Sequence, residues 1–146
     1  MRDQRQVKNA SSQTAHPQYN SNTIDYDYMV ITVSSDFTYD EFVKPIALVA
    51  PSDSELPNGT QCQSSGYGYW KHVNGNPTEI APTLQWMDID CITIAECKKV
   101  WRIQTLGPRQ QCANSNGVTS CMGDSGGPLT TEEDGEQKLL GKNRLD

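Results

Sequence analysis

Residues 120–129 read S-C-M-G-D-S-G-G-P-L, and this stretch decides how the rest of the chain is interpreted. Glycine and proline break both helices and central strands, so we expect a tight loop around Ser125. A plain surface turn is one interpretation, because Asp, Ser and Gly are common turn residues. The other interpretation is a loop that carries a reactive serine.

A serine hydroxyl becomes a useful nucleophile only with a base that takes its proton and donors that hold the developing oxyanion. Gly123 has no side chain, so its N–H can approach a substrate carbonyl closely. Gly126 and Gly127 let the backbone turn sharply behind Ser125. Asp124 would clamp the loop if its carboxylate met a buried cation. The loop therefore has the parts that a nucleophile needs, apart from the base.

The composition limits the classes of function. The chain has 146 residues and a formal net charge of −6, which argues against a nucleic-acid partner. No apolar run approaches the roughly 20 residues that span a membrane, so we expect no membrane contact. The first residues are polar, and no signal peptide is visible in them.

The cysteine count is five, which leaves at least one thiol without a partner inside the chain. The spacing contains no C-x-x-C, and neither histidine lies near a cysteine in sequence, so we expect no metal and no cofactor. Disulfides in an oxidising compartment are the better interpretation. The cysteines are Cys62, Cys91, Cys97, Cys112 and Cys121.

The pattern predicts a mostly β chain with one short helix. Residues 1–23 are polar and rich in turn signals. Thr93 and Glu96 have the spacing of a capping box, which predicts a helix over 93–102. Strands are expected over 28–33, 61–69 and 83–89, an edge piece that Pro45 weakens over 43–49, and a loop over 70–82.

The stretch C-M-G-D-S-G-G-P-L resembles the nucleophile loop of the chymotrypsin/trypsin family of serine endopeptidases. H-P-Q-Y-N-S-N-T-I-D-Y-D-Y-M-V-I at 16–31 resembles the segment that holds the triad aspartate, which places that role on Asp27. Further matches follow in the family's order: V-K-P-I-A-L, G-T-Q-C-Q-S-S-G-Y-G and L-Q-W-M-D-I-D-C-I-T-I-A-E-C.

The resemblance implies an all-β, trypsin-like double β-barrel. Residues 1–50 would be the remnant of the first barrel, 51–58 the linker and 59–146 a truncated second barrel. The implied function is peptide-bond hydrolysis through a serine acyl-enzyme, with no cofactor. The implied partners are protein or peptide substrates and protease inhibitors, and the implied location is extracellular.

The resemblance also assigns roles to single residues. Asp27 and Ser125 would be catalytic, and the N–H groups of Gly123 and Ser125 would form the oxyanion hole. Thr119 and Met122 would contact substrate. Because Thr119 is neutral where an aspartate would attract basic side chains, we expect an apolar P1 residue.

Cysteine pairing follows from the same resemblance. Cys97 and Cys112 match a family disulfide. The usual partner of Cys62 falls on Thr131, so Cys91 is its candidate partner. Cys121 matches a cysteine whose partner lies beyond this chain.

The sequence departs from the family in three segments: A-A-H-C, I-V-G-G and S-W-G are absent from it. His16 and His72 do not match the triad histidine, and we expect both to be solvated loop histidines. Asp124 would lack its family partner, a new N-terminal amine. We therefore expect the chain as written to be inactive. The alternative is a non-catalytic homologue that acts as a protein-binding module.

Overall fold

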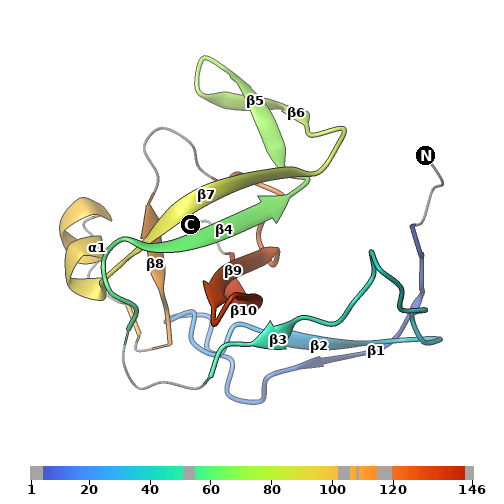
Figure 1. Cartoon of the computed structure of the whole chain (residues 1–146). Helices are drawn as coiled ribbons and strands as arrows, with labels where there is room; N and C mark the ends of the chain where they lie inside the picture. The colour runs from blue at the N-terminus through green and yellow to red at the C-terminus, as the bar shows by residue number, and fades with distance from the viewer. Residues whose placement is uncertain (1–4, 51–54, 102–105, 108, 115–119, 144–146) are drawn as a thin grey trace. The chain divides into compact units, whose positions relative to one another are not determined.

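The computed structural model describes residues 5–50, 55–101, 106–107, 109–114 and 120–143 (Figure 1). In these ranges the chain forms mainly β-strands and one short helix, which confirms the predicted all-β class. The residues group into two compact units. Met1–Pro45 and Gly107–Arg109 make up the first, and Ile46–Leu106 and Gln110–Asp146 the second.

The first unit contains a two-stranded antiparallel sheet of β1 (Ala10–Ala15) and β2 (Met29–Val33). Strand β2 confirms the strand expected from its β-branched sequence. The sequence predicts no strand within residues 1–23, yet β1 forms there, because pairing with β2 outweighs the weak strand preference of A-S-S-Q-T-A. The hydrogen bond from His16 N to Tyr28 O, at 3.1 Å, closes the loop between the strands.

The second unit is built on a six-stranded sheet in the order β3-β10-β9-β4-β7-β8. The strands expected over 61–69 and 83–89 are present with shifted ends. The piece expected over 43–49 shortens to two residues at the sheet edge, as Pro45 predicts. The strands are β3 (Ala47–Leu48), β4 (Thr60–Gly66), β7 (Gln85–Ile92), β8 (Cys112–Asn114), β9 (Pro128–Glu133) and β10 (Glu136–Lys142).

A small core lies against this sheet. Cys62, Cys91 and Leu129 are buried at its centre. The partly buried side chains packed around them are Leu56, Ile89 and Leu140. The core is small because the chain is poor in apolar residues, so cross-links and hydrogen bonds have to contribute more of the stability.

The loop expected over 70–82 is instead a hairpin of β5 (Tyr69–Val73) and β6 (Asn76–Ile80). Asn74 and Gly75 connect the strands, with φ values of 52° and 79°. Positive φ at both positions is the type I′ geometry that favours Asn-Gly in hairpins. The expected loop is therefore present only as this short turn, because strands pair on both sides of it.

Helix α1 (Ile94–Trp101) begins after Thr93, as predicted. The Glu96 amide donates to Thr93 Oγ1 at 3.3 Å, which is one half of the expected capping box. The other half differs, because Thr93 N donates to Asn58 Oδ1 at 2.7 Å. Glu96 instead forms an ion pair with Lys99 at 3.0 Å.

Candidate active site

The loop around Ser125 consists of two consecutive tight turns. Asp124 N donates to Cys121 O at 2.9 Å, and Gly127 N donates to Asp124 O at 2.9 Å. The third residue of each turn has a positive φ, 97° at Gly123 and 87° at Gly126. This combination defines type II turns, which require glycine at that position. Ser125 is the second residue of the second turn, and it is exposed.

Asn143 anchors the turns to the end of β10. Gly126 N donates to Asn143 O at 2.8 Å, and Asn143 N donates to Gly127 O at 2.7 Å. The Asn143 side-chain amide also donates to the buried Ser64 Oγ at 2.6 Å. The segment on either side of Ser125 is thus tied to β4, and sequence reasoning missed Asn143 because nothing local marks this contact.

Asp124 uses both carboxylate oxygens to hold the backbone. Oδ1 accepts a hydrogen bond from Gly68 N at 2.8 Å, and Oδ2 accepts one from Cys121 N at 2.9 Å. A Cβ at Gly66 would lie 2.0 Å from Asp124 Oδ1, and one at Gly68 would lie 2.6 Å from its Cγ. The S-G-Y-G sequence therefore makes room for this carboxylate, and backbone amides fill the role expected of a cation.

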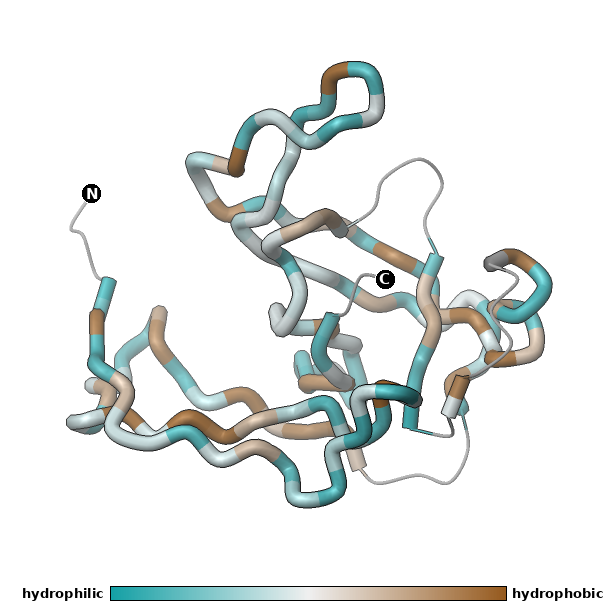
Figure 2. Tube along the Cα trace, turned by 180° about the vertical axis from the view of Figure 1, so that it is seen from behind, coloured by the Kyte–Doolittle hydropathy of each residue, from teal (hydrophilic) through white to brown (hydrophobic). Residues whose placement is uncertain are grey.

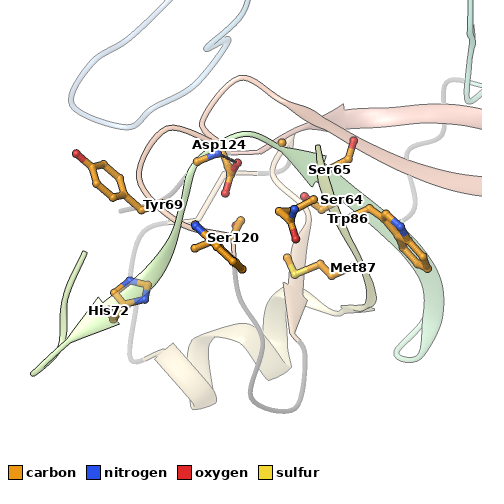
Figure 3. Close-up of a pocket in the computed structure, with 12 residues that line it drawn as sticks. Ser64, Ser65, Tyr69, His72, Trp86, Met87, Ser120 and Asp124 are labelled. Carbon is orange, nitrogen blue, oxygen red and sulfur yellow. Dashed lines mark hydrogen bonds between the residues drawn. The ribbon is translucent and has the colours of Figure 1, made fainter. Parts of the chain in front are cut away.

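A cavity of about 350 Å³ opens beside Asp124 (Figure 3). Ser64 and Met87 line it from the sheet, and Ser120 lines it from the chain before the turns. His72 contributes from β5, and its Nε2 lies 3.3 Å from Cys121 Sγ. The expectation of a loop position for His72 is wrong, since it lies on a hairpin strand beside a thiol.

Asp27 lies in the first unit, just before β2, and is half-buried. Tyr28 N donates to Tyr26 O at 2.8 Å, so Asp27 is the central residue of a γ-turn. Ile24 and Tyr26, which precede Asp27 in the sequence, both have left-handed backbone conformations, with φ values of 55° and 52°. Such conformations cost about 1–3 kcal/mol each and persist only where the surroundings enforce them.

Arg109 supplies contacts to this strained segment. Its Nε donates to Asp25 Oδ1 at 2.8 Å, and its Nη2 pairs with Asp25 Oδ2. Its guanidinium carbon lies 4.1 Å from the centre of the Tyr26 ring. The hydrogen bond from Arg109 is the main reason that the pKa of Asp25 lies below its ordinary value. Sequence reasoning missed Arg109.

His16 also belongs to this cluster. Its ring stacks on Tyr26 with centroids 4.4 Å apart and an interplanar angle of 6°. Its Nδ1 accepts a hydrogen bond from Gln18 N at 3.2 Å. His16 lies in a loop, as expected, but it is half-buried against an aromatic ring and not fully solvated.

The sequence-predicted site residues divide between the two units. Asp27 belongs to the first, while Met122, Gly123 and Ser125 belong to the second. Met122 is 55% exposed, and its carbonyl accepts a hydrogen bond from Tyr69 N at 2.9 Å. Thr119 lies outside the described residues. The meeting of Asp27 with Ser125 stays a prediction.

The cysteines pair as expected. Cys97 and Cys112 form a disulfide with Cα atoms 6.1 Å apart. Cys62 and Cys91 form the second, with Cα atoms 6.4 Å apart. Cys121 is a free cysteine. Thr131 lies opposite Cys62 in the ladder of β4 and β9, at the position where the resemblance places the missing partner.

Comparisons of this chain with known proteins gave one family match and several similar proteins. Residues 1–143 match the Trypsin family. The chain is 35% identical over 127 residues to the atrial natriuretic peptide-converting enzyme of Mus musculus, covering 86% of this chain and 11% of that protein. The Homo sapiens and Rattus norvegicus enzymes are each 34% identical over 86% of the chain, which spans 12% and 11% of their lengths.

Proposed function

The chain belongs to the trypsin family of serine-type peptidases, and from this premise we propose that Ser125 and Asp27 are members of its catalytic triad. The observation that carries the proposal is the pair of type II turns that presents an exposed Ser125. Asp124 and Asn143 hold these turns on both sides. A plain surface turn needs neither a two-point carboxylate anchor nor close packing against glycines.

In the proposed reaction, Ser125 Oγ attacks the carbonyl carbon of a peptide bond. A histidine base accepts the hydroxyl proton and passes it to the leaving amine, which leaves an acyl-enzyme that water hydrolyses. Asp27 orients and steadies the charged imidazole. The N–H groups of Gly123 and Ser125 hold the oxyanion, as the family resemblance implies.

The missing component is the base. His16 stacks on Tyr26, and His72 lies beside Cys121, and neither matches the triad histidine of the family. A general base contributes roughly 10²–10⁴-fold to the rate, and triad members act as a unit. We therefore propose that these 146 residues, expressed alone, have no peptidase turnover above background.

The domain bounds, the P1 preference and the ligands that we propose follow from the family resemblance. Residues 1–50 contribute the first-barrel part with Asp27, 51–58 the linker and 59–146 the second-barrel part with Ser125. A neutral Thr119 favours an apolar P1 residue over a basic one, with Met122 beside the substrate. The ligands are proteins, peptides or protease inhibitors.

The proposed location is extracellular, because two disulfides are typical of oxidising compartments. Across the described part of the chain, no helix is long and apolar enough to cross a membrane.

A second candidate function is that of a non-catalytic homologue that binds proteins through its sheet surface. The absence of a match to the family's triad histidine among these residues favours it. The two functions differ in one property, because only a peptidase needs a reactive Ser125.

The test is labelling of Ser125 by an organophosphonate, together with cleavage of an apolar-P1 peptide. The chain alone should show neither. Fusion of a family segment with A-A-H-C ahead of residue 1 should restore labelling, and Ser125→Ala should abolish it. A fused chain that folds and still does not label would favour the binding module. Cleavage by the chain alone, abolished by Ser125→Ala, would contradict the proposed inactivity.

A further inference from the structure

We propose that Arg109 is a positioning residue for Asp27, because it holds the left-handed turn from which Asp27 projects. The inference rests on the proposed function of Asp27 and extends it to a residue that no triad assignment includes. Arg109 acts through two neighbours of Asp27 in the sequence, Asp25 and Tyr26.

The turn before Asp27 has an energetically costly backbone conformation. Ile24 and Tyr26 both have φ between 50° and 60°, in a region that β-branched and bulky residues avoid. Their backbones would relax to negative φ unless other contacts prevented it. Because Asp27 directly follows Tyr26, relaxation there would redirect the Asp27 side chain.

Hydrogen bonds through Asp25 hold this turn. Asp25 lies between the two left-handed residues, Ile24 and Tyr26. Its backbone carbonyl accepts a hydrogen bond from Asn20 N at 3.0 Å. The Asp25 carboxylate accepts from Tyr26 N at 2.9 Å. The same carboxylate accepts two hydrogen bonds from Arg109. Asp25 therefore links the strained backbone to a cation from a distant segment.

The Tyr26 ring is held by contacts of its own. The Arg109 guanidinium lies 4.1 Å from the Tyr26 ring centre, and the His16 ring stacks on Tyr26 at 4.4 Å. A ring held by two partners resists the rotation that a change in its φ would require. Arg109 is suited to both contacts, because a planar guanidinium can pair with a carboxylate at two points and stack on a ring.

The Asp25 side chain is only 22% exposed, whereas Arg109 is 47% exposed. Arg109 can therefore be replaced without opening a core cavity, so a change in the turn can be separated from unfolding.

The experiment is NMR on the full 146-residue chain with Arg109→Gln, Arg109→Lys and Asp25→Asn. Left-handed residues give a strong intraresidue HN–Hα NOE, because these two protons are closest at positive φ. The NOEs of Ile24 and Tyr26 should be strong in the parent chain and weaken in Arg109→Gln. Exchange of the Tyr28 amide, which closes the γ-turn, should become about two- to fivefold faster, the factor for one exposed cation–π contact. Arg109→Lys should rescue part of both effects.

Lys71→Gln is the matched control, because Lys71 pairs with Glu79 and lies 4.6 Å from the Trp70 ring in the other unit. It should leave Ile24, Tyr26 and Tyr28 unchanged. Unaltered NOEs and exchange in both Arg109→Gln and Asp25→Asn would overturn the inference. Exchange that rises equally throughout β1 and β2 would also overturn it, since Arg109 would then only stabilise the fold. None of these readouts depends on Ser125, so failure of the proposed peptidase function would leave them unchanged.

Discussion

Arg109 and Asp25 are separated by 84 residues in the sequence, yet they form a two-point ion pair within one compact unit. The pair brings a residue that follows helix α1 into the cluster around the β1–β2 loop. It therefore ties the segment before Asp27 to a part of the chain that the sequence places far away.

The pair makes a prediction about pH. Because Arg109 lowers the pKa of Asp25, the folded chain binds this proton less tightly than the unfolded chain does. The contribution to stability is complete above the ordinary aspartate pKa of about 3.9 and is lost as the pH falls through the lower folded value. In Arg109→Gln this acid-sensitive contribution should shrink. Unfolding followed by the Tyr26 ring signals between about pH 5 and 2 measures it. If Arg109→Gln loses stability with falling pH to the same extent as the parent chain, the prediction is wrong.

The two type II turns make a prediction about glycine. Gly123→Ala and Gly126→Ala should each lower the free energy of unfolding by about 1 kcal/mol or more, because alanine is strained at positive φ. Gly123→Ala should be the worse of the two, since its Cβ would lie 3.0 Å from Gly68 Cα. Gly141→Ala is the control, because a Cβ there meets nothing within 4 Å. Denaturant unfolding followed by tryptophan fluorescence measures all three, and equal stabilities would refute the turn assignment.

The Asp124 carboxylate makes a third prediction. Asp124→Asn leaves one oxygen to accept from both Gly68 N and Cys121 N, so one amide loses its partner. The expected cost is about 1–3 kcal/mol of unfolding free energy. Asp88→Asn, at an exposed position on β7, should change stability by less than about 0.5 kcal/mol. If both variants lose a similar amount of unfolding free energy, the removed charge causes the effect, and the contacts with the backbone amides do not.

The cysteine arrangement makes a fourth prediction. Alkylation of the oxidised chain under denaturing conditions should modify Cys121 alone, as peptide mass spectrometry can show. Replacing Cys97 and Cys112 together by serine should cost about 3 kcal/mol, because they are separated by 15 residues. Cys121→Ser should leave the unfolding free energy nearly unchanged. Alkylation at Cys97 or Cys112 would contradict the pairing.

The local sequence pattern correctly predicted the strands and helix ends that depend on residues close together in the sequence. Strand β2 follows from its β-branched residues, and the start of α1 follows from Thr93. The strands β1 and β6 were missed because they are stabilised by a partner strand. Residues 10–15 contain only alanine and polar residues, and Pro77 argues against a strand in β6. The Asp134-Gly135 turn between β9 and β10, with φ 56° and 77°, has the same Asx-Gly signal as Asn74-Gly75 and was not recognised.

The candidate site was predictable only in part. The glycines around Ser125 indicated special turns, and the family resemblance supplied Asp27. The contacts that hold these residues join distant segments, such as Asn143 with Ser64 and Arg109 with Asp25. Side chains of this kind carry no local signal, so sequence reasoning had no means of finding them.

Strand β2 has a consequence for the handling of this chain. Met29, Val30 and Ile31 are 50%, 63% and 57% exposed on a two-stranded sheet. They lie in the uncharged run Y-M-V-I-T-V at 28–33. Figure 2 colours the trace by hydropathy and shows hydrophobic segments in brown. Six-residue segments of high β-propensity, without charge or proline, are the ones that stack into amyloid-like steric zippers. A chain stored at high concentration should therefore form thioflavin-binding fibrils seeded by β2. A single Ile31→Lys substitution should delay them, because it places a repelling charge in every layer of the stack.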